Sequence, residues 1–212
     1  KAILKAGYSF VSCSDEVIEN GSVELQDYPF VDLILGKEKQ TKMGRGAMAL
    51  EFKTFTPSMQ QALTDYCQKG GSLFISGAYV GSDLWDNPMA NQTDKEFATE
   101  VLKYKWRAGQ AAIEGKVKSV TSPYSVLGIQ YTYYNELNAE SYVVESPDAI
   151  EPATNEAFTI LRYSENNLSA GIAYKGKYKT FVTGFPFESL RSESERESLM
   201  KSVLDFFDSP TE

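Results

Sequence analysis

Residues 56–77 read TPSMQQALTDYCQKGGSLFISG, and this stretch decides the predicted fold. Thr56 is a typical N-cap, and Pro57 suits the first position of a helix. Apolar side chains then recur on one helical face at positions 59, 62, 63, 66 and 67. A double glycine ends the helix, and residues 72–76 form a short β run closed by Gly77. Helix, glycines and β run together predict a crossover unit of a parallel sheet.

Further strands are predicted on the amino-terminal side of this unit. Tyr8–Ser14 alternates large and small side chains, as a strand does. Phe30–Leu35 is a compact apolar run ended by Gly36, which is typical of a buried parallel strand. The long, basic, glycine-bearing segment 37–55 is predicted to be a covering or functional loop.

The second half of the chain has a different pattern. Short alternating runs at 129–133, 142–144, 158–161, 170–174 and 178–182 predict antiparallel strands. Capping boxes at Thr93–Glu96 and Ser192–Glu195 predict the starts of two helices. We therefore predict one α/β domain over residues 1–212: a flavodoxin-like three-layer sandwich with a mainly parallel sheet, a β-rich antiparallel C-terminal half and a final helix. Because Lys1–Gly7 reads as the end of a helix, we expect the domain to come from a longer multidomain protein.

Composition excludes several classes of function. The formal charge of -8 disfavours a nucleic-acid partner, because phosphate binding needs a basic surface. No apolar run approaches the roughly 20 residues that span a bilayer. The chain has no histidine, which removes the usual general base and the commonest zinc ligand. Cys13 and Cys67 do not form a disulfide framework, and we expect buried, inert thiols whose pairing the sequence leaves open.

Ligands of open parallel sheets bind beyond the carboxyl ends of the strands. This rule defines a candidate pocket without an assigned catalytic residue, metal or cofactor. Its residues are Gly36, Lys37, Gly77, Tyr79, Gly81, Ser82, Asp83 and Glu188.

Two motifs at these strand ends carry a family resemblance. Gly77-Ala78-Tyr79-Val80-Gly81 stands where a Gly-x-Cys-x-Gly nucleophile elbow would lie, and Phe185-Pro186-Phe187-Glu188 is similar to a strand ending in Gln-Phe-His-Pro-Glu. In this respect the chain resembles the class I glutamine-amidotransferase-like superfamily. The resemblance puts Tyr79 in the nucleophile position and Glu188 in the position of the triad carboxylate, and no residue supplies the histidine. It therefore implies a pseudoenzyme.

At closer range, the stretches GYSFVSCSDE, DLILGK, GGSLFISGAYVGSD and GFPFES resemble a domain of large bacterial proteins that carry the label xanthan lyase. That resemblance implies a secreted, periplasmic or cell-envelope protein linked to polysaccharide processing. The resulting hypothesis is a noncatalytic domain that binds carbohydrate, a partner or neighbouring domains. The alternatives are a polysaccharide-active enzyme, either a tyrosine-assisted lyase or a metal-dependent hydrolase, and a purely architectural module.

Three further groups of residues have both a functional and a structural interpretation. Aromatic residues that could stack on sugar rings or fill the core are Trp85, Trp106, Tyr131, Tyr133 and Tyr134. Basic residues that could clamp an anion or simply face solvent are Lys37, Lys39, Lys42 and Arg45. Acidic residues that could hold a hard cation or stay solvated are Asp83, Asp86 and Glu188.

Overall fold

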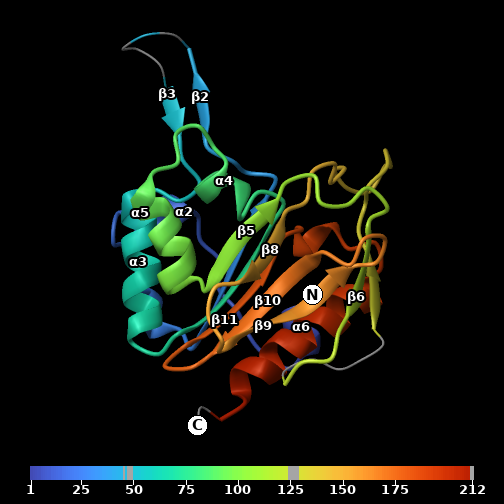
Figure 1. The fold of residues 1–212 in the computed structure, drawn as a ribbon. Coiled ribbons are helices and arrows are strands. Elements are labelled where there is room, and N and C mark those ends of the chain that lie inside the picture. Colours follow the sequence, from blue (N-terminus) through green and yellow to red (C-terminus); the bar gives the residue numbers. More distant parts are fainter. Residues whose placement is uncertain (45, 47–49, 124–128, 211–212) are drawn as a thin grey trace.

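The computed structural model describes residues 1–44, 46, 50–123 and 129–210, and its centre is a seven-stranded sheet (Figure 1). In spatial order the strands are β1 (Phe30–Gly36), β4 (Ser72–Gly77), β11 (Lys179–Thr183), β10 (Ser169–Lys175), β9 (Ala157–Tyr163), β6 (Lys116–Ser119) and β7 (Gln130–Thr132). Two small antiparallel sheets accompany it. They are formed by β2 (Thr41–Met43) with β3 (Leu50–Phe52), and by β5 (Tyr104–Ala108) with β8 (Ala149–Pro152).

The prediction of a flavodoxin-like, mainly parallel sandwich is wrong. Only β1, β4 and β11 are parallel neighbours, and every other pairing in the large sheet is antiparallel. The sheet is mixed and curls into a half-barrel. The parallel pattern of residues 56–77 is local, and residues 116–183 build most of the sheet from neighbouring antiparallel strands. The antiparallel second half and the final helix are present as predicted.

Two longer helices begin and end close to the predicted positions. In α3 (Pro57–Gln68) the Thr56 hydroxyl accepts a hydrogen bond from the Met59 amide at 3.1 Å. In α6 (Glu193–Asp208) Ser192 and Glu195 form the predicted capping box. Such caps stabilise a helix by about 1 kcal/mol each, so local sequence fixes these boundaries.

The remaining helical elements are short. They are α1 (Ala2–Lys5), α2 (Asp15–Glu19), the 3₁₀ turn η1 (Leu25–Asp27), α4 (Ser82–Trp85), α5 (Gln92–Glu96), the π-helical turn η3 (Phe97–Val101) and the 3₁₀ turn η4 (Phe187–Ser189). The capping box of α5 uses Asn91 and Asp94, so the predicted start at Thr93 is two residues late. In the described part of the chain, no helix combines the length and apolarity needed to cross a membrane.

The core has two layers, one on each face of the sheet. Leu73 and Ile75 of β4 pack in the cluster that contains α3, whereas Phe74 packs with α6 on the opposite face. Alternation of this kind follows from the period of two in a strand. The β5–β8 ribbon contributes Tyr104 and Ile150 to the α3 side. Both faces of β4 are therefore covered, which explains why three consecutive apolar residues, Leu73–Ile75, stand at its centre.

Three predictions of irregular or extended structure need correction. Residues 8–14 and 142–144 form no strand. Segment 37–55 is not a plain loop, because it contains the β2–β3 hairpin, which projects from the body of the molecule (Figure 1). Alternating side chains are compatible with a strand, but a strand also needs hydrogen bonds to a neighbouring strand. Within the described residues, the backbones of Tyr8 and Ser14 bond only to nearby residues of the chain, and those of residues 9–13 form no hydrogen bond.

Candidate functional site

The predicted pocket residues follow the carboxyl ends of β1, β4 and β11, as the strand-end rule requires. Gly36 and Gly77 are register partners at the ends of β1 and β4, and the Ala78 amide donates to the Gly36 carbonyl at 2.8 Å. Gly36 has a φ of +55°, a conformation that favours glycine. Beyond these ends the remaining residues separate into three local groups with different partners.

The first group is the turn that follows β4. The amides of Gly81 and Ser82 both donate to Oδ2 of Asp148, at 2.7 and 2.6 Å. Two adjacent amides of this kind are the donors that would stabilise a developing oxyanion in an acyl-transfer enzyme. Here they are already bound to an internal carboxyl group.

Asp148 is the residue of this region that sequence reasoning missed. It is fully buried, and its Oδ1 accepts a hydrogen bond from the Trp106 indole at 3.4 Å. Burial raises the pKa of Asp148 to about 7, although its amide and indole donors act in the opposite direction. Its backbone is equally enclosed, because a Cβ on Gly184 would lie 2.0 Å from the Asp148 carbonyl oxygen.

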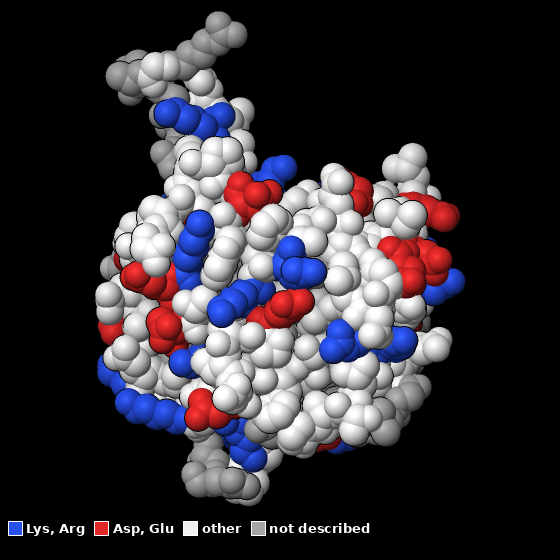
Figure 2. All heavy atoms as spheres, viewed as in Figure 1, with Lys and Arg blue, Asp and Glu red and all other residues white. Residues whose placement is uncertain are grey.

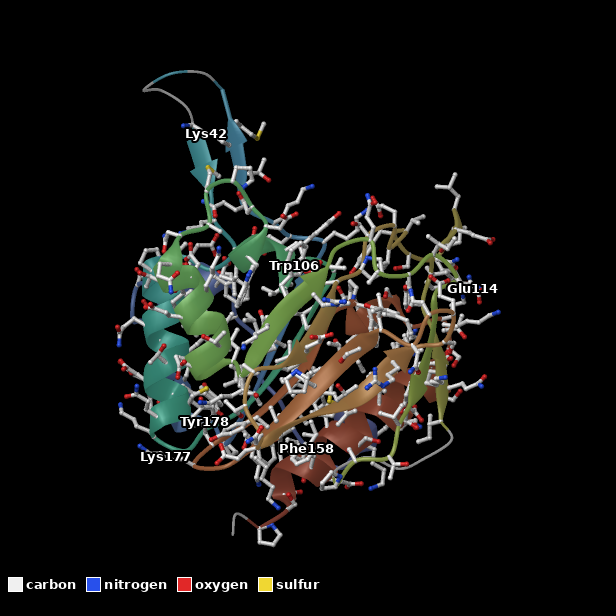
Figure 3. The ribbon with its side chains drawn as sticks, in the orientation of Figure 1. Lys42, Trp106, Glu114, Phe158, Lys177 and Tyr178 are labelled. Atoms are coloured by element: carbon white, nitrogen blue, oxygen red, sulfur yellow. The ribbon has the colours of Figure 1, made fainter. Side chains whose placement is uncertain are left out.

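Figure 3 shows Trp106 on β5, below the hairpin that carries Lys42. Asp148 directly precedes β8, the strand that pairs with β5. The β5–β8 ribbon therefore delivers both Trp106 and Asp148 to the turn after β4. Nothing in the local sequence around Asp148 predicts this contact, because it depends on packing between segments 66 residues or more apart.

Tyr79, which occupies the nucleophile position of the resemblance, is half-buried. The Lys39 ammonium lies 4.8 Å from the centre of its ring. A cation over an aromatic face is a stabilising contact worth about 0.5–1 kcal/mol at exposed sites. The sequence contains no histidine that could remove the phenolic proton, and the contact found at Tyr79 is a packing contact.

The second group is centred on Asp83, which is 4% exposed. Its Oδ1 accepts the Gln40 amide at 2.5 Å, and the Asn87 side chain lies 3.3 Å from the same oxygen. Burial raises the pKa of Asp83, and these hydrogen bonds partly offset the effect. Because Gln40 directly precedes β2, Asp83 attaches the base of the hairpin to the body of the domain.

The third group contains a pair of carboxyl groups. Tyr142 donates its hydroxyl to Oε1 of Glu188 at 2.5 Å, and a Cβ on Gly36 would lie 3.3 Å from both groups. Burial and the charge of Glu188 raise the pKa of Asp32, on β1, to about 7. Oδ1 of Asp32 and Oε2 of Glu188 are buried and have no hydrogen-bond partner among the described residues. Neither Asp32 nor Tyr142 is among the predicted pocket residues.

The basic residues of segment 37–45 are dispersed. Lys37 pairs with Glu145 at 2.6 Å, which lowers the pKa of Glu145. Lys39 covers Tyr79, and Lys42 lies on the hairpin. Arg45 lies outside the described residues. Figure 2 shows acidic and basic side chains interspersed over the visible face of the body. The described lysines therefore do not converge as an anion clamp would require.

The aromatic residues considered for sugar stacking do not form one platform. Tyr131 and Tyr133 are 2% and 0% exposed, so their rings belong to the core. Arg191 lies over Tyr134, and Lys95 lies over Trp85. Trp106 is half-buried and hydrogen-bonded to Asp148. Core packing, the structural interpretation, holds for Tyr131 and Tyr133.

The two cysteines are free and differ in environment. Cys67 is buried, and burial raises the pKa of its thiol to about 12. Cys13 is exposed, so the prediction that both thiols are buried is wrong for this residue. Among the residues with a described placement, no cluster of three or more acidic or cysteine side chains could hold a metal ion.

No family model and no curated protein matches the sequence. Among solved structures, the fold is similar to one described as "mmIFT52 N-terminal domain", with a TM-score of 0.50 and 15% sequence identity. That match covers 98% of this chain and 87% of the other. A second similar structure is the exo-beta-1,4-mannosidase Op5Man5 from Opitutaceae bacterium strain TAV5, with a TM-score of 0.44 and 8% identity over 87% of this chain and 25% of that one.

At 15% sequence identity, the similarity to the first of these structures concerns the fold alone. The resemblance to the amidotransferase-like superfamily stays a prediction from the motifs. The fold and the comparisons give no support to the labels flavodoxin-like, amidotransferase-like, xanthan lyase or secreted, and none of them is carried further.

Proposed function

We propose that this chain is a noncatalytic domain whose function is to bind a partner protein. Asp148 supports the noncatalytic part of the proposal most strongly. Its Oδ2 occupies both amides of the turn after β4, so no donor pair remains there for a substrate oxyanion. The carboxyl group is fully buried, which also keeps it from reaching a substrate.

The chemistry of the same turn supports the proposal as well. Acyl transfer needs a nucleophile beside a base. The chain has no histidine, and the nucleophile position holds Tyr79 with Lys39 over its ring. Cys67 is buried with a raised pKa, so its thiolate is not formed at neutral pH.

A protein partner fits the exposed side chains better than a carbohydrate does. Sugar rings stack on flat aromatic faces, and Tyr131 and Tyr133 are enclosed in the core. Among the described residues, four of the eight exposed large apolar side chains lie within positions 4–34: Leu4, Phe10, Val11 and Ile34. A partner protein that covered these side chains would remove apolar surface from water.

A hydrolysis assay tests the noncatalytic part. We expect the purified chain to release no more product from glutamine or p-nitrophenyl acetate than buffer does. Tyr79→Phe serves as the matched variant, because it removes only the phenolic oxygen. Hydrolysis by the wild type that disappears in Tyr79→Phe would contradict the proposal.

The alternative of a polysaccharide-active enzyme needs its own assay. A panel of glycans, incubated with and without Mg²⁺ or Ca²⁺, is read for unsaturated products and for new reducing ends. We expect neither. Product formation that depends on the protein would favour the enzyme alternative and exclude a purely binding role.

A further inference from the structure

Three oxygen atoms near the carboxyl ends of β1 and β4 are buried and have no hydrogen-bond partner within the described residues. They are Oδ1 of Asp32 on β1, Oγ of Ser76 on β4 and Oε2 of Glu188 on η4. Buried polar atoms are normally hydrogen-bonded, and each exception needs a physical explanation such as a bound ion or water. Three exceptions in one region point to a common explanation.

Strand register places Asp32 and Ser76 on the same face of the sheet. Asp32 is the register partner of Phe74, and Ser76 is the register partner of Ile34. Side chains two residues apart in a strand share a face, so Asp32 and Ser76 both project to the α6 side, where Phe74 packs. Diagonal neighbours of this kind on adjacent strands are about 7–8 Å apart. One ion can contact a carboxyl and a hydroxyl oxygen across this spacing.

Glu188 reaches the same region from η4, which lies against β1. Its Oε1 would be 3.3 Å from a Cβ on Gly36, and Gly36 is two residues beyond Ile34 on the strand. Burial and the charge of Glu188 together raise the pKa of Asp32, so the two carboxyl groups are electrostatically coupled. Tyr142 donates to Oε1 at 2.5 Å, which orients the carboxyl group and leaves Oε2 without a donor.

Burial distinguishes these three oxygens from a cluster of acids on the surface. Ser76 is 0% exposed, so bulk water does not satisfy its hydroxyl group. Asp32 and Glu188 are half-buried as whole residues, so each side chain borders solvent although one of its oxygens is enclosed. Ile34, on the same face of β1, is 55% exposed, so this part of the sheet is open to solvent. A small ion could therefore enter from that side and keep water ligands there.

We propose that Asp32, Ser76 and Glu188 bind a hard divalent cation, Mg²⁺ in preference to Ca²⁺. Hard cations take oxygen ligands, and Mg²⁺ is usually held by one or two carboxylates while it keeps several waters. Ca²⁺ takes about 6–8 oxygen ligands. Two carboxyl groups and one hydroxyl match the pattern for Mg²⁺. This set is smaller than the clusters of three or more acidic or cysteine side chains that the described part of the chain lacks.

The cation site is separate from the turn after β4, where Asp148 binds the amides of Gly81 and Ser82. The inference therefore goes beyond the proposed partner-binding function and does not depend on it. A bound cation would balance both carboxylates and connect β1, β4 and η4. Protonation of Asp32 is the competing explanation for the unpartnered Oδ1, and it makes no use of the Ser76 hydroxyl. The two explanations thus predict different results for Ser76.

Isothermal titration calorimetry of the full chain with MgCl₂ tests the proposal. The buffer is at pH 8, above the pKa of about 7 of Asp32, so that protons compete little with the metal. It contains about 0.15 M KCl, which screens weak attraction to scattered surface carboxylates. We expect one saturable site per chain, and weaker binding in a parallel titration with CaCl₂.

Four variants identify the ligands. Asp32→Asn and Glu188→Gln each remove one negative charge and should weaken Mg²⁺ binding at least about tenfold. Ser76→Ala removes a neutral hydroxyl group and should also weaken binding about tenfold, which a purely electrostatic effect would not produce. Asp86→Asn makes the same change of charge as Asp32→Asn at an exposed carboxylate and should leave the affinity unchanged. Circular dichroism spectra establish that the variants fold.

Mn²⁺ locates the site independently of affinity. It accepts the same oxygen ligands as Mg²⁺, and its unpaired electrons broaden the NMR signals of nearby amides. Broadening should be strongest at the amides of Ile34, Gly77 and Ser189, which flank the three proposed ligands in the sequence or on the same strand. Excess Mg²⁺ should reverse it.

The proposal is overturned if the wild type shows no saturable Mg²⁺ binding at millimolar concentrations, or if Ca²⁺ binds more tightly than Mg²⁺. It is also overturned if Asp32→Asn or Ser76→Ala binds Mg²⁺ as the wild type does, or if Mn²⁺ broadens signals elsewhere in the chain. None of these results bears on the hydrolysis of glutamine or p-nitrophenyl acetate. Failure of the cation site is therefore distinguishable from failure of the proposed function.

Discussion

Asp32→Asn should remove a large part of the pH dependence of stability. The pKa of Asp32 is about 7 in the folded chain, against an ordinary value of 3.8, because burial and the charge of Glu188 oppose ionisation. The folded state therefore binds a proton that the unfolded state has released between these two pH values. Stability from this group is present at low pH and is lost as the pH rises toward 7.

The magnitude follows from the difference between the two pKa values. A gap of about three pH units corresponds to about 4 kcal/mol when the group is fully ionised, at 1.36 kcal/mol per unit. Of this contribution to the free energy of unfolding, the wild type should lose about 2.5 kcal/mol between pH 5 and pH 8. Asparagine carries no charge at either pH, and any cost of burying its amide is the same at both. Between pH 5 and pH 8, the free energy of unfolding of the variant should therefore rise by about 2.5 kcal/mol relative to that of the wild type.

Urea unfolding followed by circular dichroism at pH 5 and pH 8 measures this difference. Asp148, whose pKa is also raised, contributes the same slope to both proteins and cancels in the comparison. Asp86→Asn, at an exposed carboxylate, is the matched control and should keep the slope of the wild type. If the free energies of unfolding of Asp32→Asn and of the wild type change by the same amount between the two pH values, the reasoning about this buried carboxyl group is refuted.

Three further perturbations have clear expected outcomes. Gly184→Ala would place a Cβ 2.0 Å from a backbone oxygen and should lower the free energy of unfolding, measured by urea titration, by about 3 kcal/mol or more. In the control Gly109→Ala, the nearest atom to the new Cβ is 3.6 Å away, so the free energy of unfolding should fall by less than about 1 kcal/mol. Equal effects of the two substitutions would contradict the packing described. Ellman's reagent should modify only the exposed Cys13 in the native chain and reach the buried Cys67 on unfolding, and rapid reaction of both thiols would argue against this core. Ser192→Ala should lower stability by about 1 kcal/mol through loss of the α6 cap, and an unchanged urea midpoint would show that the cap is dispensable.

Local signals in the sequence predicted elements well. Thr56 and Pro57 fix the start of α3, and Ser192 with Glu195 fixes the start of α6, because each cap involves residues within one helical turn. The strand ends at Gly36 and Gly77 were also found from sequence. These features depend only on backbone conformation and neighbouring side chains.

The arrangement of the sheet could not be obtained in the same way. Alternation within 158–161 or 170–174 identifies strands, but it does not state which neighbour each strand takes. Parallel and antiparallel partners satisfy the same pattern of side chains. One clear crossover unit at residues 56–77 therefore led to a mainly parallel prediction, although most pairings of the sheet are antiparallel.

The candidate site shows the same limit at the level of single residues. The glycines around Tyr79 indicate a tight turn, and the turn is present, but its chemistry is decided by Asp148 from a distant segment. Likewise, the pattern of residues 131–133 does not reveal that both tyrosines face the core. A motif built of glycines reports backbone geometry, and the reactive groups must be located separately.

β1 shows why a disagreement between sequence and structure is itself informative. Its residues predict a strand covered on both faces and paired on both edges, and residues 8–14 are predicted to form a strand as well. The structure satisfies neither expectation, since one edge of β1 and the backbone of residues 9–13 are unpaired. Natural sequences rarely place a run such as Val31–Leu35 at an open edge of a sheet, because exposed apolar edge strands promote aggregation. The apolar composition of β1 therefore predicted more cover and more pairing than the described residues give it.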